Sequence, residues 1–322
     1  HYRHFAGGPW ALYQGLKGKF DVRVWMEDSY LTQIAGPRSV EALQRATGED
    51  LSDIKFLRYR KTQIAGKTVE VGRIGMSGNL AYEVRGPIAD GPAVYDAIYQ
   101  ANKDIGIERL GWRTYLVNHV EGGFPQANWT FGMAVVNDQG FRDWVGEDHF
   151  ALHSQRTGSY DPADLRARQR NPFEVNWDKA VRFDHEFIGR AALEKIAASP
   201  DQRRTVTLRW NADDVIDIYA SLYRPGEEYR TMDLPTTPTW GHGMLEHADR
   251  LLAGDRLVGM SSGSIYSYYF RENLSMGCVD VSHAEPGTEL IVQWGDHGKR
   301  IKDVRVTVDR FPYLDEKRNS EA

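Results

Sequence analysis

A single carboxylate interrupts an apolar strand pattern in GRIGMSGNLAYEVRGP, residues 72–87. Residues 80–85 alternate in polarity, and side chains of a strand alternate between faces with a period of two. This pattern predicts that Glu83 lies on the face opposite Tyr82 and Val84, where it is a candidate acceptor for hydrogen bonds from a ligand. A same-face ion pair with Arg85 is the alternative.

Three glycines, Gly72, Gly75 and Gly78, precede this strand with a spacing that suggests a phosphate-binding loop. Such a loop joins a strand to the N-terminus of a helix. Here a second strand pattern follows Gly78, and the spacing GxxGxxG differs from both common phosphate loops. The glycines therefore predict a turn between two strands.

Other side chains with chemical potential have equally plausible packing roles. His119 lies on the apolar stripe of a predicted helix, where a core role and a ligand role both stay open. Trp129, Phe131 and Trp144 can stack on a flat ring or pack in a core. Cys278 lies in an apolar strand pattern, which favours a buried small residue over a nucleophile.

Two histidine pairs have a spacing that occurs in metal sites. They lie in HYRH, residues 1–4, and HFALH, residues 149–153. Neither pair is accompanied by a third ligand cluster, so no metal site is predicted.

The composition is that of an ordinary soluble protein: 322 residues, 41% hydrophobic and 26% charged, with a net charge of −5. This charge does not suggest binding to nucleic acid, which favours a basic surface. The single cysteine excludes an internal disulfide and fits a reducing cytoplasm. No apolar run approaches the roughly 18–20 residues of a membrane span, so no membrane association is expected.

The first half of the chain mixes strands and helices without a strict βαβ order, which favours an α+β fold. Strands are predicted at residues 20–25, 30–35, 69–74 and 80–85. Helices are predicted from Pro37 to a stop at Gly48, after Pro92, and over residues 111–123. The opening residues predict a strand that runs into a Gly-Gly-Pro turn, so the sequence is expected to begin inside a domain.

The second half changes character after a short helix that is predicted to end near Ala198. At least five short strand patterns follow, separated by Gly, Pro and Asp: TVTLRW, RLVGMSS, LSMGCVDV, TELIVQW and IKDVRVTV. They predict a small β-barrel or sandwich. The expected domains are residues 1–198 and residues 199–322.

Four motifs, in order along nearly the whole chain, resemble the glycine-cleavage T-protein family of tetrahydrofolate-dependent methyl and aminomethyl transferases. They are LTQIAGPRSVEALQ, RIGMSGNLAYEVRGP, NPFEVNWDKAVRFDHEFIGRAALEKI and LVGMSSGSIYS with LSMGCVDV and PGTELIVQWGD. Within the family, TVTLRWNADDVIDIYASLY and RFDHEFIGRAALEKI most resemble aryl O-demethylases. The resemblance implies an α+β folate-binding domain of the aminomethyltransferase type, N-terminally incomplete, followed by a small antiparallel β-barrel domain.

The resemblance also implies an activity. The expected enzyme is a cytoplasmic methyltransferase that moves the methyl group of a vanillate- or syringate-like methoxylated aromatic acid to N5 of tetrahydrofolate. The alternatives are an aminomethyltransferase of the glycine-cleavage type and a non-catalytic folate-binding module of the same fold.

Site residues follow from the resemblance position by position. Glu83 matches the family carboxylate that binds the pterin ring, and Tyr82, His119 and Trp144 are further expected cofactor contacts. His119 stands where the T-protein has a folate-binding arginine, which argues against plain aminomethyl transfer. His4 or Arg3 is expected to hold the substrate carboxylate. The catalytic residues of the family are expected upstream of His1, so none is assigned.

Overall fold

The computed structural model describes residues 7–19, 21–25, 27–127, 129–149, 152–233 and 245–315. Its contacts divide the chain into two compact units, residues 1–22 with 125–313, and residues 23–124 with 314–322. We call these the barrel unit and the sheet unit. Residues 125–198 belong to the barrel unit, so the compact units do not divide at the expected boundary of 198/199. A boundary between folding domains at that place stays a prediction.

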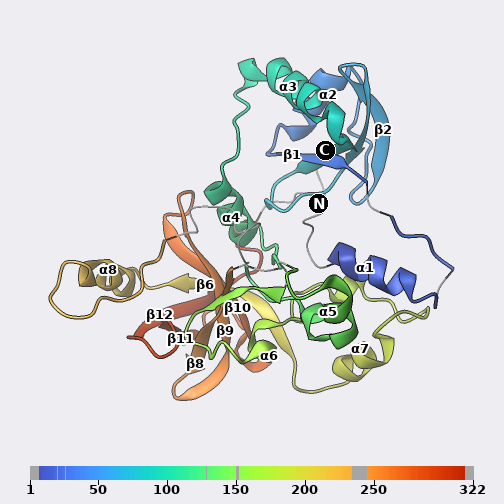
Figure 1. Ribbon diagram of the computed structural model, residues 1–322. Coiled ribbons are helices and arrows are strands. Elements are labelled where there is room, and N and C mark those ends of the chain that lie inside the picture. The colour runs from blue at the N-terminus through green and yellow to red at the C-terminus, as the bar shows by residue number, and fades with distance from the viewer. Residues whose placement is uncertain are drawn as a thin grey trace. The chain divides into compact units, whose positions relative to one another are not determined.

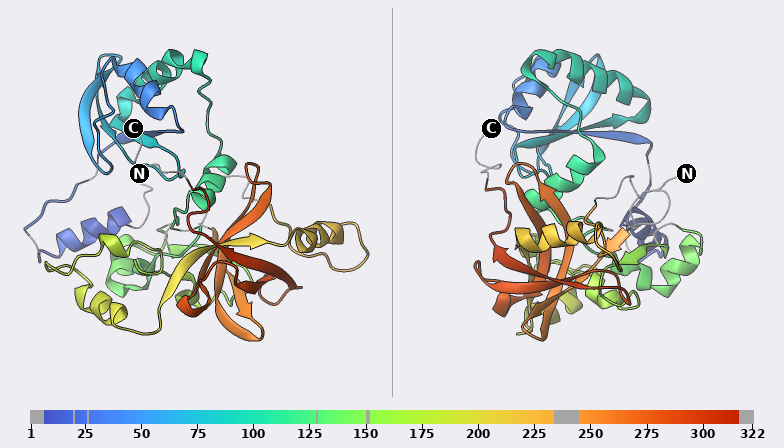
Figure 2. Two further views of the ribbon diagram at one scale, coloured as in Figure 1. Left: turned by 180° about the vertical axis from the view of Figure 1, so that it is seen from behind. Right: turned by 90° about the vertical axis from the view of Figure 1, so that its left-hand side faces the viewer.

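The sheet unit contains a four-stranded antiparallel sheet with strand order β1-β4-β3-β2 (Figure 1). Its strands are β1 (Ser29–Ala35), β2 (Tyr59–Ile64), β3 (Lys67–Gly72) and β4 (Ala81–Pro87), and its α-helices are α2 (Ser39–Thr47), α3 (Gly91–Ala101) and α4 (Trp112–Glu121). Helices α2 and α3 lie side by side over one face of the sheet (Figure 2). Strand β2 has no counterpart among the predicted strands.

The helix-covered face holds the core of this unit. Leu43 of α2 and Val94 of α3 are fully buried against Tyr82 and Val84 of β4. The alternation of apolar residues therefore places the odd and even positions of β4 on the faces predicted from sequence. Gly48 ends α2 in the left-handed conformation with φ of 75°, as the predicted stop required.

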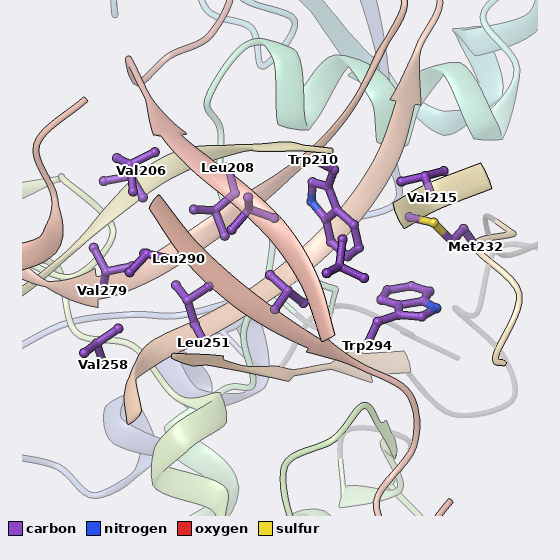
Figure 3. Close-up of a cluster of buried hydrophobic side chains, with 14 of the residues drawn as sticks. Val206, Leu208, Trp210, Val215, Met232, Leu251, Val258, Val279, Leu290 and Trp294 are labelled. Atoms are coloured by element: carbon purple, nitrogen blue, oxygen red, sulfur yellow. The ribbon is translucent and has the colours of Figure 1, made fainter. Parts of the chain in front are cut away.

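The barrel unit is built around a closed barrel of six antiparallel strands in the order β10-β6-β12-β11-β8-β9. The strands are β6 (Arg203–Trp210), β8 (Asp249–Ala253), β9 (Arg256–Ser267), β10 (Glu272–Asp280), β11 (Glu289–Trp294) and β12 (Lys302–Asp309). Leucine, valine and tryptophan side chains point inward and fill the barrel (Figure 3). Closure leaves no free sheet edge. The predicted antiparallel barrel is confirmed.

Helices and a short strand pair complete this unit. They are α1 (Gly7–Leu16), α5 (Gln139–Val145), α6 (Leu165–Arg168), α7 (Arg190–Ala197), α8 (Ala212–Ser221), and β5 (Gln155–Thr157), which pairs in parallel with β7 (Leu245–His247). Helix α7 ends where the sequence predicted a helix end.

Two predictions near the start of the chain are wrong. Gly7, Gly8 and Pro9 begin helix α1 instead of a turn, because proline is tolerated in the first turn of a helix, where its missing N–H costs nothing. Residues 21–25 form no strand. Their alternating side chains are mostly exposed, so no apolar face is buried there to stabilise one.

Candidate functional site

Glu83 lies on the face of the sheet opposite α2 and α3. Strand register places Gln33 of β1 directly across from it on one side and Gly72 of β3 on the other. Tyr59 of β2 lies directly across from Gly72. Because partners across antiparallel strands share a face, Gln33, Glu83, Gly72 and Tyr59 form one row across the sheet. We call this the Glu83 row.

The Glu83 carboxylate is half-buried, and within the described residues no hydrogen bond or ion pair engages it. Burial raises its pKa above the usual 4.5, and the charge of Arg85 opposes this shift. The Arg85 guanidinium instead donates to Glu70, with 2.6 Å between Nε and Oε2. Glu70 is the direct cross-strand partner of Arg85, which explains why the same-strand ion pair with Glu83 does not form.

The glycines before β4 let the preceding loop pack closely beside this row. A Cβ at Gly75 would lie 2.2 Å from the Ala81 Cβ and 2.8 Å from Gln33 Nε2. Gly78 has a φ of 83°, and a Cβ there would lie 2.8 Å from the Cα of Gly122 at the end of α4. The loop therefore forms a wall beside Gln33, and the glycines serve turn geometry and close packing.

Tyr82 does not share the face of Glu83. Its side chain is fully buried in the helix-covered core, and burial raises the pKa of its hydroxyl. As the neighbour of Glu83 along the strand it must point the opposite way. The structure therefore gives Tyr82 a packing position, and its expected contact with the cofactor finds no support in this geometry.

His119 is buried on α4 within the sheet unit. Its Nδ1 lies 2.9 Å from the backbone oxygen of Phe124, and its ring meets that of Tyr115 edge to face at 4.6 Å between centroids. Burial lowers its pKa to about 4, so the imidazole is neutral near pH 7. A neutral imidazole cannot supply the positive charge of the arginine that the family has at this position.

Trp144 lies on α5 of the barrel unit, and its side chain is partly exposed. Its ring packs at 5.6 Å from the ring of Tyr13 and at 6.1 Å from that of Phe141. The exposed part of the indole leaves one surface able to stack on a ligand. Arg3 and His4 lie outside the described residues.

A groove of about 730 Å³ follows the outer edge of β1 in the sheet unit. Gln33 and Ser77 line it, together with Tyr95, Tyr99 and Arg109, whereas Glu83 does not. Gln33 therefore lines this groove and also belongs to the Glu83 row.

A half-buried carboxylate without a partner suits a ligand with two adjacent N–H donors. Such a ligand offers charge-assisted hydrogen bonds that repay the cost of burying the charge. The edge of a pterin ring carries donors of this kind, so the residues of the Glu83 row fit the pterin of folate. In the ranges described, no three His, Cys, Asp or Glu side chains are grouped as metal ligands would be.

Comparisons with known proteins found a matching family model and similar enzymes. The GCVT N-terminal domain model matches residues 10–129. A sesamin methylene transferase of Sinomonas sp. (strain No.22) is 37% identical over 99% of this chain and 73% of that protein. A syringate O-demethylase of Sphingobium sp. (strain NBRC 103272 / SYK-6) is 31% identical over 89% of this chain and 63% of that protein.

The fold has a solved counterpart in the glycine cleavage system aminomethyltransferase T of Bartonella henselae. The two structures align with a TM-score of 0.61 and 17% identity, over 98% of this chain and 68% of that one. The chain belongs to the GCVT family, the glycine-cleavage T-protein family that its motifs resemble. It spans about three quarters of the length of the sesamin methylene transferase and under two thirds of the length of the syringate O-demethylase.

In the described part of the chain, no helix combines the length and apolar character needed to cross a membrane.

Gln33 and Tyr59 were not candidates from sequence, and Gly72 was assigned to a turn. Each looks like an ordinary strand or turn residue in its own segment, and only the pairing of four strands brings them beside Glu83. No local pattern specifies that pairing.

Proposed function

We propose that this protein is a tetrahydrofolate-dependent O-demethylase that removes the methyl group of a methoxylated aromatic acid of the vanillate or syringate type. The observation that carries the proposal is the half-buried Glu83 carboxylate, which no other described residue engages, in the position of the family's pterin-binding acid. The relative named as a syringate O-demethylase supports the substrate class.

When bound, tetrahydrofolate would supply N5 as the acceptor of the methyl group, and the ether oxygen would leave as the phenolate. Glu83 accepts two N–H hydrogen bonds from the pterin and so fixes the orientation of the ring. Such positioning removes translational and rotational freedom before the reaction. Arg3 or His4 would hold the substrate carboxylate, and His119 keeps the end of α4 in place through its bond to Phe124.

A donor assay tests the activity. The intact enzyme is incubated with tetrahydrofolate and with vanillate or syringate carrying an isotope-labelled methyl group. Label transferred to folate, with release of the phenol, supports the proposal. No transfer from any methoxylated aromatic acid contradicts it.

The role of Glu83 is tested by calorimetric titration of Glu83→Ala with tetrahydrofolate. Loss of two hydrogen bonds to a charged group, each worth about 1.5–3 kcal/mol, weakens binding by about 3 kcal/mol or more, or over about 100-fold. Glu41→Ala is the matched control, because this carboxylate belongs to α2 on the other side of the sheet, where it pairs with Arg38. An unchanged dissociation constant for Glu83→Ala would contradict the proposed pterin contact and would leave Glu83 as a surface charge.

Transfer of a methylene group is a second candidate, favoured by the 37% identity to the sesamin methylene transferase. The same assay with sesamin as donor separates the two, because a methyl and a methylene adduct of folate differ by two hydrogens in mass. Aminomethyl transfer and a non-catalytic folate-binding role predict no product from either aromatic donor.

A further inference from the structure

Gly72 ends β3 within the Glu83 row, at a position where the fold itself does not require glycine. Its φ lies outside the left-handed region. A Cβ there would meet only the Tyr59 Cβ at 3.7 Å and the Arg58 backbone oxygen at 3.9 Å, both ordinary contacts. Glycine in a strand is destabilising relative to alanine, because it loses more conformational freedom on folding. The missing side chain therefore lowers stability without serving the backbone.

The other strand glycine of this sheet has a packing reason. A Cβ at Gly86 of β4 would lie 3.1 Å from Cε1 of the Tyr30 ring. In the loop between β3 and β4, Gly75 and Gly78 are required by close approach and by a positive φ. A strand glycine without such a reason often marks a place where a ligand approaches the backbone.

The missing side chain of Gly72 leaves a gap on the sheet, and the neighbouring residues give this gap its shape. On one side lies the Glu83 carboxylate and on the other lies Tyr59, which is 63% exposed. The Tyr59 ring centroid lies 5.8 Å from Cζ of Arg85, two strands away. The Arg85 guanidinium lies over β3, where it pairs with Glu70, so the Tyr59 ring stands beside the face of that strand. It bounds the gap with an aromatic surface.

We propose that Gly72 is a specificity-determining residue for folate: its missing side chain lets the flat pterin ring lie over β3 between Glu83 and Tyr59. The inference rests on the proposed folate-dependent function. It adds Tyr59, which the pattern of the sequence did not single out, and Gly72, which that pattern assigned to a turn. Glu83 holds the donor edge of the ring, Gly72 supplies space for its face, and Tyr59 bounds it on the far side.

The test compares variants that fill the gap in steps. Gly72→Ala and Gly72→Val are titrated calorimetrically with tetrahydrofolate, and their thermal unfolding is recorded without ligand. We expect unfolding midpoints at or above that of the parent protein, since the added atoms meet only ordinary contacts. We expect folate affinity to fall in the order Ala, Val, by about tenfold or more for valine, the usual effect of overfilling a packed site.

Gly111→Ala and Gly111→Val are the matched controls, because Gly111 has a φ of −81° and no atom within 4 Å of an added Cβ. Both are expected to bind folate as the parent does. Tyr59→Phe is expected to keep folate affinity, and Tyr59→Ala to lower it.

Parent-like folate affinity in Gly72→Val overturns the inference. If Glu83→Ala is weakened in the same titration, the proposed function survives and only the role of Gly72 is lost. If neither variant is weakened, the pterin site itself is elsewhere. Should Gly72→Val fail to fold, Gly72→Ala decides in the same way, with an unchanged dissociation constant counting against the inference.

Discussion

At the scale of single residues, the Glu83 carboxyl group is half-buried, and burial raises its pKa above 4.5. Only the ionised form has two bare oxygens that can each accept one N–H as a charge-assisted hydrogen bond, so folate binding should weaken as pH falls through this raised pKa. The loss then begins at a higher pH than an exposed glutamate would give. Titration calorimetry between about pH 4 and 7 measures it.

Glu83→Gln is the control for this pH dependence. Glutamine keeps the shape of the side chain but does not titrate, so its weakened folate affinity should lack the component assigned to Glu83. The same pH dependence in parent and variant would show that the titrating group is the ligand or another residue.

The buried imidazole of His119 predicts how the free energy of unfolding depends on pH. Burial lowers the pKa of this imidazole from 6.5 to about 4. Between these pH values His119 is therefore protonated in the unfolded chain and neutral in the folded chain. The free energy of unfolding should therefore decrease as pH falls from about 6.5 to 4, by up to about 3 kcal/mol. Urea unfolding at several pH values tests this, and a His119→Asn variant should lose that part of the slope.

At the scale of elements, strand pairing and helix ends decide which side chains meet. Helix α2 ends at Gly48 with φ of 75°, a conformation that costs an L-residue about 1 kcal/mol. Gly48→Ala should lower the free energy of unfolding by about that amount, although a Cβ there meets nothing within 4 Å. Gly72→Ala, at a strand position outside the left-handed region and with only ordinary contacts, should not lower it. Equal effects of the two substitutions in urea unfolding would contradict this explanation.

At the scale of the whole molecule, buried charges tie residues before the barrel to the barrel itself. Asp249 of β8 is buried and accepts hydrogen bonds from Arg230 Nη2 at 3.0 Å and from the backbone N–H of Ser159 at 3.2 Å. Asp296 accepts from Arg230 Nη1 at 2.9 Å and from the N–H of Gly158 at 3.0 Å. These bonds explain why residues 125–198 share a compact unit with the barrel.

Removing the buried carboxylate should be costly. Asp249→Ala leaves the Arg230 charge without its buried partner, and breaking a buried pair costs about 3–5 kcal/mol. Asp296→Ala removes a more exposed partner of the same arginine, 42% exposed, and should cost about 1 kcal/mol. Thermal unfolding of the two variants measures the difference. Equal losses would show that burial does not set the strength of this cluster.

Most local elements, and the face of β4 on which Glu83 lies, could be predicted from the sequence. The alternation in residues 80–85 placed Glu83 opposite Tyr82, and proline and glycine marked both ends of α2, because strand period and helix caps are local properties. The antiparallel barrel followed from its short strand patterns.

The surroundings of Glu83 depend on the tertiary structure. Cross-strand register paired Arg85 with Glu70 instead of with Glu83. The same register brought Gln33, Gly72 and Tyr59 into one row, although up to 50 residues separate Gln33 from Glu83 along the chain. Register depends on which faces are buried and on how the loops close, and no short segment of the sequence contains that information.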